Sequence, residues 1–282
     1  MKYILAISGG VDSSVLLDMV AKKQMKNLSL EDIVIAHFDH GIREESVDDA
    51  EFVKKLANEY KFKFVLGREE LGKNASEKIA RKARYSFLRS ISKHREYYLV
   101  TAHHQDDLLE TILMNILRGT GWRGLSPMWS KDIMRPLLEY SKADLIEYAI
   151  KNKLEWVEDE TNYSSKYFRN RVRDVLYVMD PKLRQKMIKL YNKQKNIRKE
   201  IEDILNDLSV SPNLHIEKKQ IEELPDKLAI EILRKWTDNK LTYPQLNKLL
   251  NDIKNAKGGI DIQPGNRLLV KIRKGSLSLG KI

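Results

Sequence analysis

The sequence predicts an α/β fold: a parallel sheet with helices on both faces, followed by a helical linker and a small α+β domain. Short apolar runs typical of buried strands alternate with helical stretches, the strands at 3–7, 33–38, 62–66 and 97–102 and the helices at 13–26, 44–60 and 74–93. Strands that alternate with helices form parallel sheets covered on both faces. After Pro181 the pattern changes to one long charged helix that ends near Asn206.

The chain is therefore expected to divide into three regions. Residues 1–180 form the α/β domain, 181–208 the helical linker and 209–282 the small C-terminal domain. Within the last region the apolar spacing predicts helices over 220–236 and 243–253. Apolar runs at 268–272 and 276–279 flank a turn and predict a hairpin.

The composition argues against several classes of protein. The 282 residues include no cysteine, which removes disulfides, thiolate metal sites and cysteine nucleophiles together. The first apolar run is short and enters a glycine turn, so no signal peptide is expected. No segment approaches the roughly 20 apolar residues of a membrane span. These observations predict a soluble, cytoplasmic protein.

The net charge of +11 favours a polyanionic partner, and this charge is concentrated in one segment. Between residues 166 and 199 there are twelve lysines and arginines against two acidic residues, Asp174 and Asp180. A solvated, lysine-rich helical face would give the same count. So local an imbalance is more typical of a surface that contacts a phosphate backbone.

The first predicted strand runs directly into Ser8-Gly9-Gly10-Val11-Asp12-Ser13-Ser14, and a helix follows. Glycine adopts backbone angles closed to other residues and lets a ligand approach the main chain. A helix that begins here directs free N–H groups at the turn, and the serine hydroxyls add donors. The pattern predicts a phosphate cradle, and Asp12 beside a phosphate suggests bound Mg²⁺. The alternative is an ordinary strand-to-helix turn in which Asp12 or Ser13 caps the helix.

Two further polar clusters follow predicted strands. His37, Phe38, Asp39 and His40 end the second strand, and the HHQDD stretch at 103–107 follows the fourth. Because ligands of parallel sheets bind at the carboxyl ends of the strands, all three clusters are expected at one edge. The histidines have no compact zinc-ligand spacing and the chain has no thiolates, so structural or substrate-contacting roles are favoured over zinc.

The stretch that begins near Asp106 predicts an amphipathic helix. Its expected buried stripe comprises Leu109, Ile112, Leu113, Ile116 and Leu117. Asp107, Glu110 and Thr111 share another face by their i, i+3 and i, i+4 spacing. Acids in a first turn commonly do no more than complement the helix dipole. Beside a phosphate cradle, paired carboxylates are better explained by an amine or a metal.

Several stretches together resemble one enzyme family. The SGGVDS loop resembles the pyrophosphate loop of the N-type ATP pyrophosphatases, the PP-loop superfamily, whose Rossmann-like domain splits ATP between the α and β phosphates. Further stretches resemble the tRNA(Ile)-lysidine synthetases: HFDHGIR (37–43), ASEKIARKARYSFL (75–88), AHHQDDLLETILMNILRGTGWRGLSPM (102–128), RPLL (135–138) and WVEDETNYSSKYFRNRVR (156–173). The resemblance is dense over the first 180 residues and weaker over 224–279. The long second C-terminal domain of some members has no counterpart, so acceptor-stem contacts are expected from other elements.

The resemblance implies a reaction and a set of partners. These ligases use ATP to adenylate the C2 oxygen of cytidine 34 in a tRNA(Ile) with a CAU anticodon. The ε-amine of L-lysine then attacks C2 and expels AMP, which leaves lysidine. The resemblance further implies that residues 1–180 form the ATP-binding catalytic domain and residues 209–282 a tRNA-binding domain. The implied metal is Mg²⁺, with Asp12 as its candidate ligand, and a homodimer is left open.

The resemblance also implies roles for individual residues. Ser8, Gly9, Gly10, Val11, Asp12, Ser13 and Ser14 are expected to hold the ATP phosphates. Asp107 and Glu110 are expected to bind the lysine ammonium, and Asp107 to ease its deprotonation. Catalytic roles are also expected for Asp39 and Arg173. The remaining residues expected to contact the adenylate or the tRNA are His40, Arg43, Arg81, Arg84, Gly119, Gly121, Arg169 and Asn170.

Three other functions compete with this one. PP-loop tRNA thiolases commonly use cysteine persulfides or an iron–sulfur cluster, and the chain has no cysteine. An amidating synthetase would need a glutaminase nucleophile, which is absent. A non-catalytic RNA-binding protein on the same fold is the alternative from another class. The intact SGGVDS loop, together with Asp107 and Glu110, argues against lost catalysis.

Overall fold

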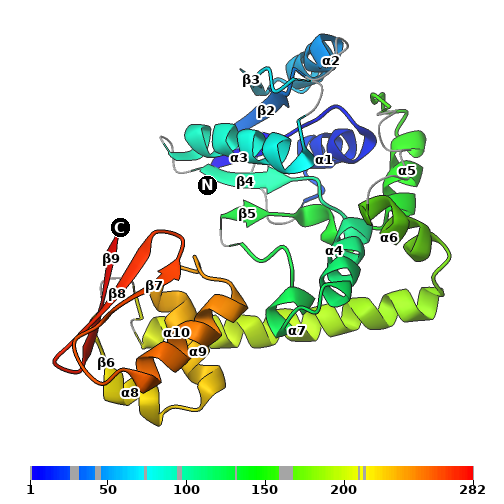
Figure 1. Ribbon diagram of the computed structural model, residues 1–282. Coiled ribbons are helices and arrows are strands. Elements are labelled where there is room, and N and C mark those ends of the chain that lie inside the picture. The colour runs from blue at the N-terminus through cyan, green and yellow to red at the C-terminus, as the bar shows by residue number, and fades with distance from the viewer. Residues whose placement is uncertain are drawn as a thin grey trace. The chain divides into compact units, whose positions relative to one another are not determined.

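Figure 1 shows the computed structural model of the chain, which describes residues 2–25, 32–41, 46–72, 75–93, 97–130, 132–158, 168–208, 210–211 and 214–281. The chain forms two compact units. Met1–Thr120 and Gly124–Leu190 make up the N-terminal unit, and Gly121–Arg123 and Tyr191–Ile282 make up the C-terminal unit.

The division between the units falls inside one helix, α7 (Pro181–Asp207), whereas the sequence predicted boundaries at 180/181 and 208/209. The reason lies in the packing of α7. Met187 and Ile188 pack on an apolar cluster of the N-terminal unit, and Leu205 is buried in the core of the C-terminal unit. The stretch expected to be a linker is therefore shared between the two units.

The N-terminal unit is built on a five-stranded sheet in which every neighbouring pair of strands is parallel. Its strands are β1 (Lys2–Ala6), β2 (Ile33–Asp39), β3 (Lys63–Arg68), β4 (Tyr97–Thr101) and β5 (Ile133–Met134), in the order β3-β2-β1-β4-β5. The predicted fold class is confirmed, and four of the strands were predicted. The fifth, β5, was not, because two residues carry no periodicity.

Six helices of the described residues belong to this unit alone. They are α1 (Val11–Ala21), α2 (Ser46–Glu59), α3 (Glu77–Lys93), α4 (Gln105–Leu117), α5 (Lys142–Lys151) and α6 (Phe168–Tyr177). Short 3₁₀ turns occur at Trp122–Leu125 and Pro136–Glu139. Neither α5 nor α6 was predicted from the sequence. In the described part of the chain, no helix combines the length and apolar character needed to span a membrane.

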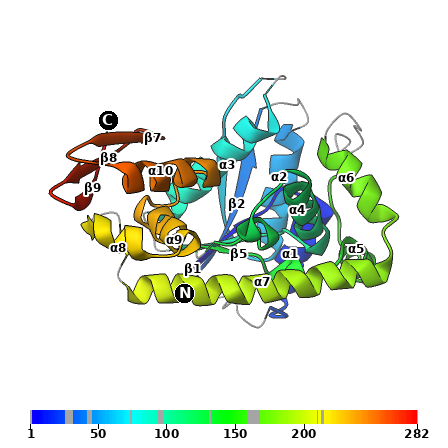
Figure 2. The same ribbon diagram turned by 60° about the horizontal axis from the view of Figure 1, so that its bottom comes forward.

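Alternate residues of each strand enter different cores. Leu5 and Ile35 pack in the cluster formed with α1 and α2, and Ile4 and Val34 pack with Leu88 of α3 on the opposite face. Figures 1 and 2 show α3 on one side of the sheet and α1 and α2 on the other. Both faces of the sheet are therefore covered by apolar side chains, which explains why the strands read as continuous apolar runs. Polar groups are left for the carboxyl ends of the strands.

The C-terminal unit combines the end of α7 with three helices and an antiparallel sheet. Its elements are β6 (Ile216–Glu217), α8 (Lys218–Glu223), α9 (Asp226–Trp236), α10 (Tyr243–Asn255), β7 (Asp261–Gly265), β8 (Leu268–Arg273) and β9 (Ser276–Lys281), with strand order β6-β9-β8-β7. The predicted hairpin is β8–β9. The helix predicted over 220–236 is wrong, because Pro225 ends α8 and caps α9.

Candidate functional site

The turn between β1 and α1, here the 8–14 loop, is held together by the Ser13 side chain. The Ser13 hydroxyl accepts the backbone N–H groups of Ser8 (3.2 Å) and Gly9 (3.1 Å), and it donates to the Gly10 carbonyl (2.9 Å). Ser14 Oγ donates to the Gly9 carbonyl at 3.3 Å. Both serines are buried. Their hydroxyls therefore fix the loop from the inside.

The same turn presents backbone donors at the start of α1. Gly10 is the N-cap residue and no side chain caps the helix, so the capping roles considered for Asp12 and Ser13 are wrong. The first-turn N–H groups of a helix have no partner within it, and the helix dipole favours an anion there. Gly9 has a φ of +95°, a conformation that other residues rarely adopt. This geometry fits a phosphate cradle.

Asp12 is paired with groups from two other elements. Lys142 Nζ, at the start of α5, lies 2.6 Å from Asp12 Oδ1, and His104 Nε2 lies 3.7 Å from Asp12 Oδ2. The backbone N–H of Lys142 donates to Asp106 at 2.7 Å. Lys142 thus connects the 8–14 loop to the start of α4. No role was predicted for this lysine from the sequence.

The start of α4 is capped by its own polar residues. His104 Nδ1 accepts the backbone N–H of Asp106 at 3.2 Å, and the Asp107 carboxylate accepts the backbone N–H of His104 at 3.1 Å. Asp107 Oδ2 also lies 3.5 Å from His104 Nε2. Asp107 therefore caps α4, and its side chain keeps 26% of its surface exposed. The carboxylate remains accessible to a ligand.

The buried stripe of α4 differs from the prediction in the last turn. Leu109 and Ile112 are buried as expected, but Ile116 and Leu117 are 46% and 61% exposed. Leu108 is buried instead, at 1% exposure. The apolar cluster that α4 forms with α6 takes in Leu109, Leu113 and Met114, and it includes neither Ile116 nor Leu117.

Glu110 is buried and pairs with arginines of α6. Arg173 Nε donates to Glu110 Oε1 at 2.6 Å, and Arg169 Nε lies 3.9 Å from Oε2. Burial raises the pKa of Glu110 above its ordinary value, and the Arg173 bond opposes that rise. From the sequence, Glu110 was expected to bind the lysine, Arg173 to be catalytic and Arg169 to contact the adenylate or the tRNA. The structure brings all three together, and Asn170 lies on the same helix as the two arginines.

Asp39, at the end of β2, stabilises the turn that follows. Its carboxylate accepts the Gly41 N–H at 2.8 Å and lies 3.5 Å from Arg68 Nε. Burial works against the charge of Asp39, but these partners hold its pKa below the ordinary value. The arrangement suits a charged group that positions its neighbours. Arg43, expected beside it, lies outside the described residues.

The arginines of α3 act on two histidines of the same edge. Burial lowers the pKa of His40, and the nearby Arg84 lowers it further. Burial also lowers the pKa of His103; Asp107 opposes this shift, and Arg135, Arg81 and Arg84 add to it. Both imidazoles are therefore neutral at pH 7. The ring of Phe87 on α3 lies 5.4 Å from the ring of Phe38, which places α3 beside the end of β2.

The two glycines expected to contact the adenylate or the tRNA fall in different units. Gly119 has a φ of +70° and follows the C-cap of α4 in the N-terminal unit. Gly121 belongs to the C-terminal unit, where Arg123 lies 2.8 Å from Glu202 of α7 and 2.6 Å from Glu231 of α9. The segment 121–123 is thus held to the C-terminal unit by half-buried ion pairs.

The donor set around the cradle fits Mg²⁺ held together with phosphates. No group of three His, Asp or Glu side chains in the described residues is arranged to hold a metal on its own. Mg²⁺ commonly takes one or two carboxylates and completes its shell with phosphate and water oxygens. Asp12 beside the uncapped start of α1 supplies such a carboxylate, 29% exposed.

Comparison with known proteins gives consistent relatives. Residues 1–179 match the family model described as a PP-loop domain. The chain is 35% identical over 267 residues to the tRNA(Ile)-lysidine synthase of Streptococcus gordonii, covering 91% of this chain and 60% of that one. It is 31% identical over 297 residues to the tRNA(Ile)-lysidine synthase of Thermotoga maritima, covering 99% of this chain and 70% of that one.

A solved structure supports the fold. The U34-tRNA thiolase NcsA from Methanococcus maripaludis, determined with its [4Fe-4S] cluster, is similar with a TM-score of 0.58 and 18% identity. The similarity covers 70% of this chain and 72% of that one. At this identity the likeness bears on the fold alone.

Proposed function

Because the chain belongs to the tRNA(Ile)-lysidine synthase family of PP-loop proteins, we propose that it converts cytidine 34 of a tRNA(Ile) with a CAU anticodon to lysidine. ATP adenylates the C2 oxygen of the base, and the ε-amine of L-lysine attacks C2 and expels AMP. One observation carries the proposal: Asp12, Lys142 and His104 join a phosphate cradle to the acidic start of α4. The activating nucleotide and an amine nucleophile could then meet at one edge.

In the first half-reaction the 8–14 loop holds the phosphates of ATP. The N–H groups at the start of α1 contact phosphate oxygens, and the Ser13 hydroxyl keeps the loop in this shape. Asp12 is the carboxylate that would hold Mg²⁺, whose charge stabilises the leaving pyrophosphate. Lys142 neutralises Asp12 in the free protein and is placed to turn toward the phosphates.

In the second half-reaction the acidic residues of α4 bind the lysine and help to deprotonate it. A free lysine amine has a pKa of about 10.4 and must lose a proton before it attacks. Asp107 is the more exposed acid and is our candidate for binding the ammonium and easing deprotonation. Glu110 adds a second negative charge, and it forms an ion pair with Arg173. Arg173 then links the lysine site to the adenylate.

The direct test is product analysis. The protein is incubated with a tRNA(Ile) transcript bearing CAU, ATP, Mg²⁺ and isotope-labelled lysine, and the RNA is digested and examined by mass spectrometry. We expect labelled lysidine at position 34 and equal amounts of AMP and pyrophosphate. A transcript with U at position 34 and the Asp12→Ala variant serve as controls. RNA binding without pyrophosphate release would instead indicate a non-catalytic RNA-binding protein.

The assembly of the protein is a separate part of the proposal. The homodimer that the family resemblance leaves open is tested by light scattering across a concentration series. A mass that stays at the monomer value at assay concentrations would restrict the catalytic site to one chain.

A further inference from the structure

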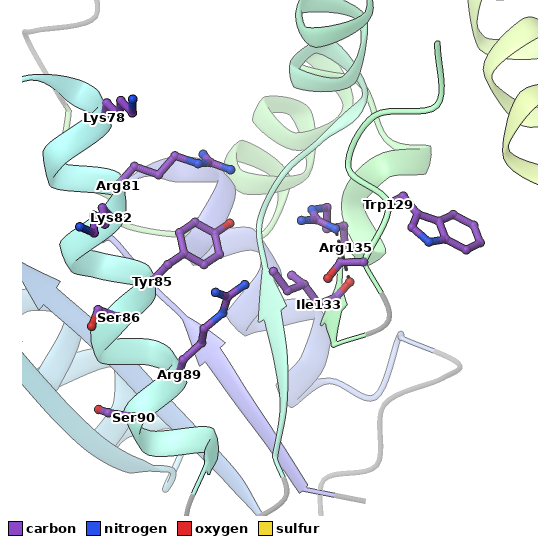
Figure 3. Close-up of a pocket in the computed structure, with 11 residues that line it drawn as sticks. Lys78, Arg81, Lys82, Tyr85, Ser86, Arg89, Ser90, Trp129, Ile133 and Arg135 are labelled. Atoms are coloured by element: carbon purple, nitrogen blue, oxygen red, sulfur yellow. Dashed lines mark hydrogen bonds between the residues drawn. The ribbon is translucent and has the colours of Figure 1, made fainter. Parts of the chain in front are cut away.

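The N-terminal unit has an open pocket of about 810 Å³ between α3 and the segment around β5. Five of its lining residues are cationic: Lys78, Arg81, Lys82, Arg89 and Arg135. None of the described residues that line it is acidic. Figure 3 shows Arg81, Tyr85 and Arg89 pointing from α3 toward the side where Arg135 and Ile133 lie. The pocket therefore suits an anion.

The Tyr85 hydroxyl supplies a second, independent sign of a ligand. It is buried and has no hydrogen-bond partner within the part of the chain that the structure describes. The guanidinium carbon of Arg81 lies 5.0 Å from the centroid of the Tyr85 ring, and that of Arg84 lies 5.7 Å away. A buried hydroxyl without a partner destabilises a folded protein. Tyr85 lines the pocket, so a small shift of the side chains that cover its hydroxyl would present this donor to an anionic oxygen.

We propose that this pocket binds backbone phosphates of a single-stranded RNA segment next to the nucleotide that is modified, and that Tyr85 donates its hydroxyl to a phosphate oxygen. Arg81 and Arg89 supply the neutralising charge on either side of Tyr85 along α3. The inference rests on the proposed function in one respect, that RNA is the substrate. It adds a binding site and a hydrogen-bond donor to that function.

The extent of the charge favours a strand over a free nucleotide. The cationic side chains run from Lys78 to Arg89 along α3, about 16 Å at the helical rise. One phosphate group needs a much smaller site, and the 8–14 loop already offers such a cradle. Proteins that bind single strands track the backbone with basic residues in this way. The pocket is also linked to the candidate site, because Arg135 lies five residues before Tyr140, whose carbonyl accepts the backbone N–H of Gln105 at the start of α4 at 2.9 Å.

The sharpest test removes only the hydroxyl. In Tyr85→Phe the ring remains for Arg81, and the buried donor without a partner is gone. We expect the affinity for an anticodon stem-loop RNA to fall about tenfold, the scale of a hydrogen bond to a charged group. The denaturation midpoint should stay the same or rise, and the affinity for ATP should not change. A purely structural tyrosine would not combine weaker RNA binding with undiminished stability.

A second test counts phosphate contacts. The double variant Lys82→Gln, Arg89→Gln removes two charges from the pocket, and Lys54→Gln, Lys55→Gln removes two from α2 as the matched control. For single strands the logarithmic salt slope of RNA affinity changes by about 0.7 per contact. We expect a shallower slope for the pocket variant and the parental slope for the control.

Each outcome bears on the proposal. Parental RNA affinity in Tyr85→Phe, or equal changes in the pocket variant and its control, would overturn it. Loss of ATP affinity with unchanged RNA affinity would assign the pocket to a free nucleotide and would also overturn it. RNA binding that depends on the pocket, without lysidine formation, would contradict the proposed reaction and would still support the RNA-binding role of the pocket.

Discussion

Lys142 Nζ lies 2.6 Å from Asp12 Oδ1, so the acid of the 8–14 loop is neutralised by a cation 130 residues further along the chain. Both side chains are partly exposed, at 39% and 29%. A ligand can therefore separate them. The pair offers a way to keep a carboxylate next to a phosphate cradle without repelling the phosphates.

Replacing Lys142 with Met should make ATP use strongly dependent on Mg²⁺. Without the ammonium, the charge of Asp12 repels the ATP phosphates unless a cation covers it. We expect the KM for ATP to rise on the order of tenfold at limiting Mg²⁺, the scale of one lost charge-assisted contact, and less at saturating Mg²⁺. The measurement is KM for ATP across a Mg²⁺ series, with Lys151→Met on the same helix as control. An increase by one constant factor at every Mg²⁺ concentration would show that Lys142 does not act through Asp12.

Replacing Ser13 with Ala should loosen the 8–14 loop. The Ser13 hydroxyl accepts two backbone N–H groups and donates to the Gly10 carbonyl, and the change leaves all three without that partner. Unpaired buried groups of this kind cost about 1–3 kcal/mol in the free energy of unfolding. Ser14→Ala loses only one bond of 3.3 Å and is the matched control. Urea denaturation and ATP binding are measured together. Equal effects of the two changes would contradict the central role given to Ser13.

The parts of the fold that repeat regularly could be predicted from the sequence. Buried parallel strands read as continuous apolar runs because both faces of the sheet are dry, and four of the five were found in this way. The 8–14 loop was found because two glycines and three serines lie between an apolar strand and an apolar helix, where backbone and hydroxyl donors gather. In both cases the signal lies within a short stretch of chain.

The parts that were missed depend on contacts between distant residues. The pairing of Glu110 with Arg173 joins α4 to α6, and nothing local in either stretch indicates that these charges meet. The sequence contains a partial indication that Lys142 has a role. Ser141 and Asp144 form a capping box that marks the start of α5. A lysine in the first turn of a helix is unfavourable there, which indicates a partner elsewhere.

The stability of the protein should fall as the pH drops below the ordinary histidine pKa of 6.5, partly through His103. Burial and the arginines nearby lower the pKa of His103 in the folded state. Between the folded and unfolded pKa values the unfolded chain binds the extra proton, so acidification favours unfolding. We expect His103→Gln to lose less stability than the parent between pH 7.5 and 5, measured by urea denaturation. Parallel losses in the two proteins would show that His103 titrates normally in the fold.

The variants that should separate the two half-reactions are Asp107→Asn and Glu110→Gln, which keep the shape of each side chain and remove its charge. Both should fold. The amide oxygen that the first change introduces can still accept the backbone N–H of His104 at the start of α4. The Arg173 side chain released by the second change is 39% exposed and can be solvated.

The lysine step should fail in these variants while the adenylation step persists. An ammonium deprived of a buried counter-charge loses on the order of 3–5 kcal/mol, roughly two to four decades in lysine affinity. Because the Asp107 side chain is 26% exposed, we expect the lower end of this range for Asp107→Asn. Pyrophosphate release that depends on tRNA should continue, because the cradle is unchanged. The matched control is Asp106→Asn, since Asp106 is already bound to Arg184 and the change should leave the lysine step intact. Pyrophosphate release and lysine incorporation are measured on the same samples. If pyrophosphate release and lysine incorporation are lost in parallel, with folding and ATP binding intact, Asp107 and Glu110 act in the adenylation step. If lysine incorporation is unimpaired, Asp107 serves only as a helix cap.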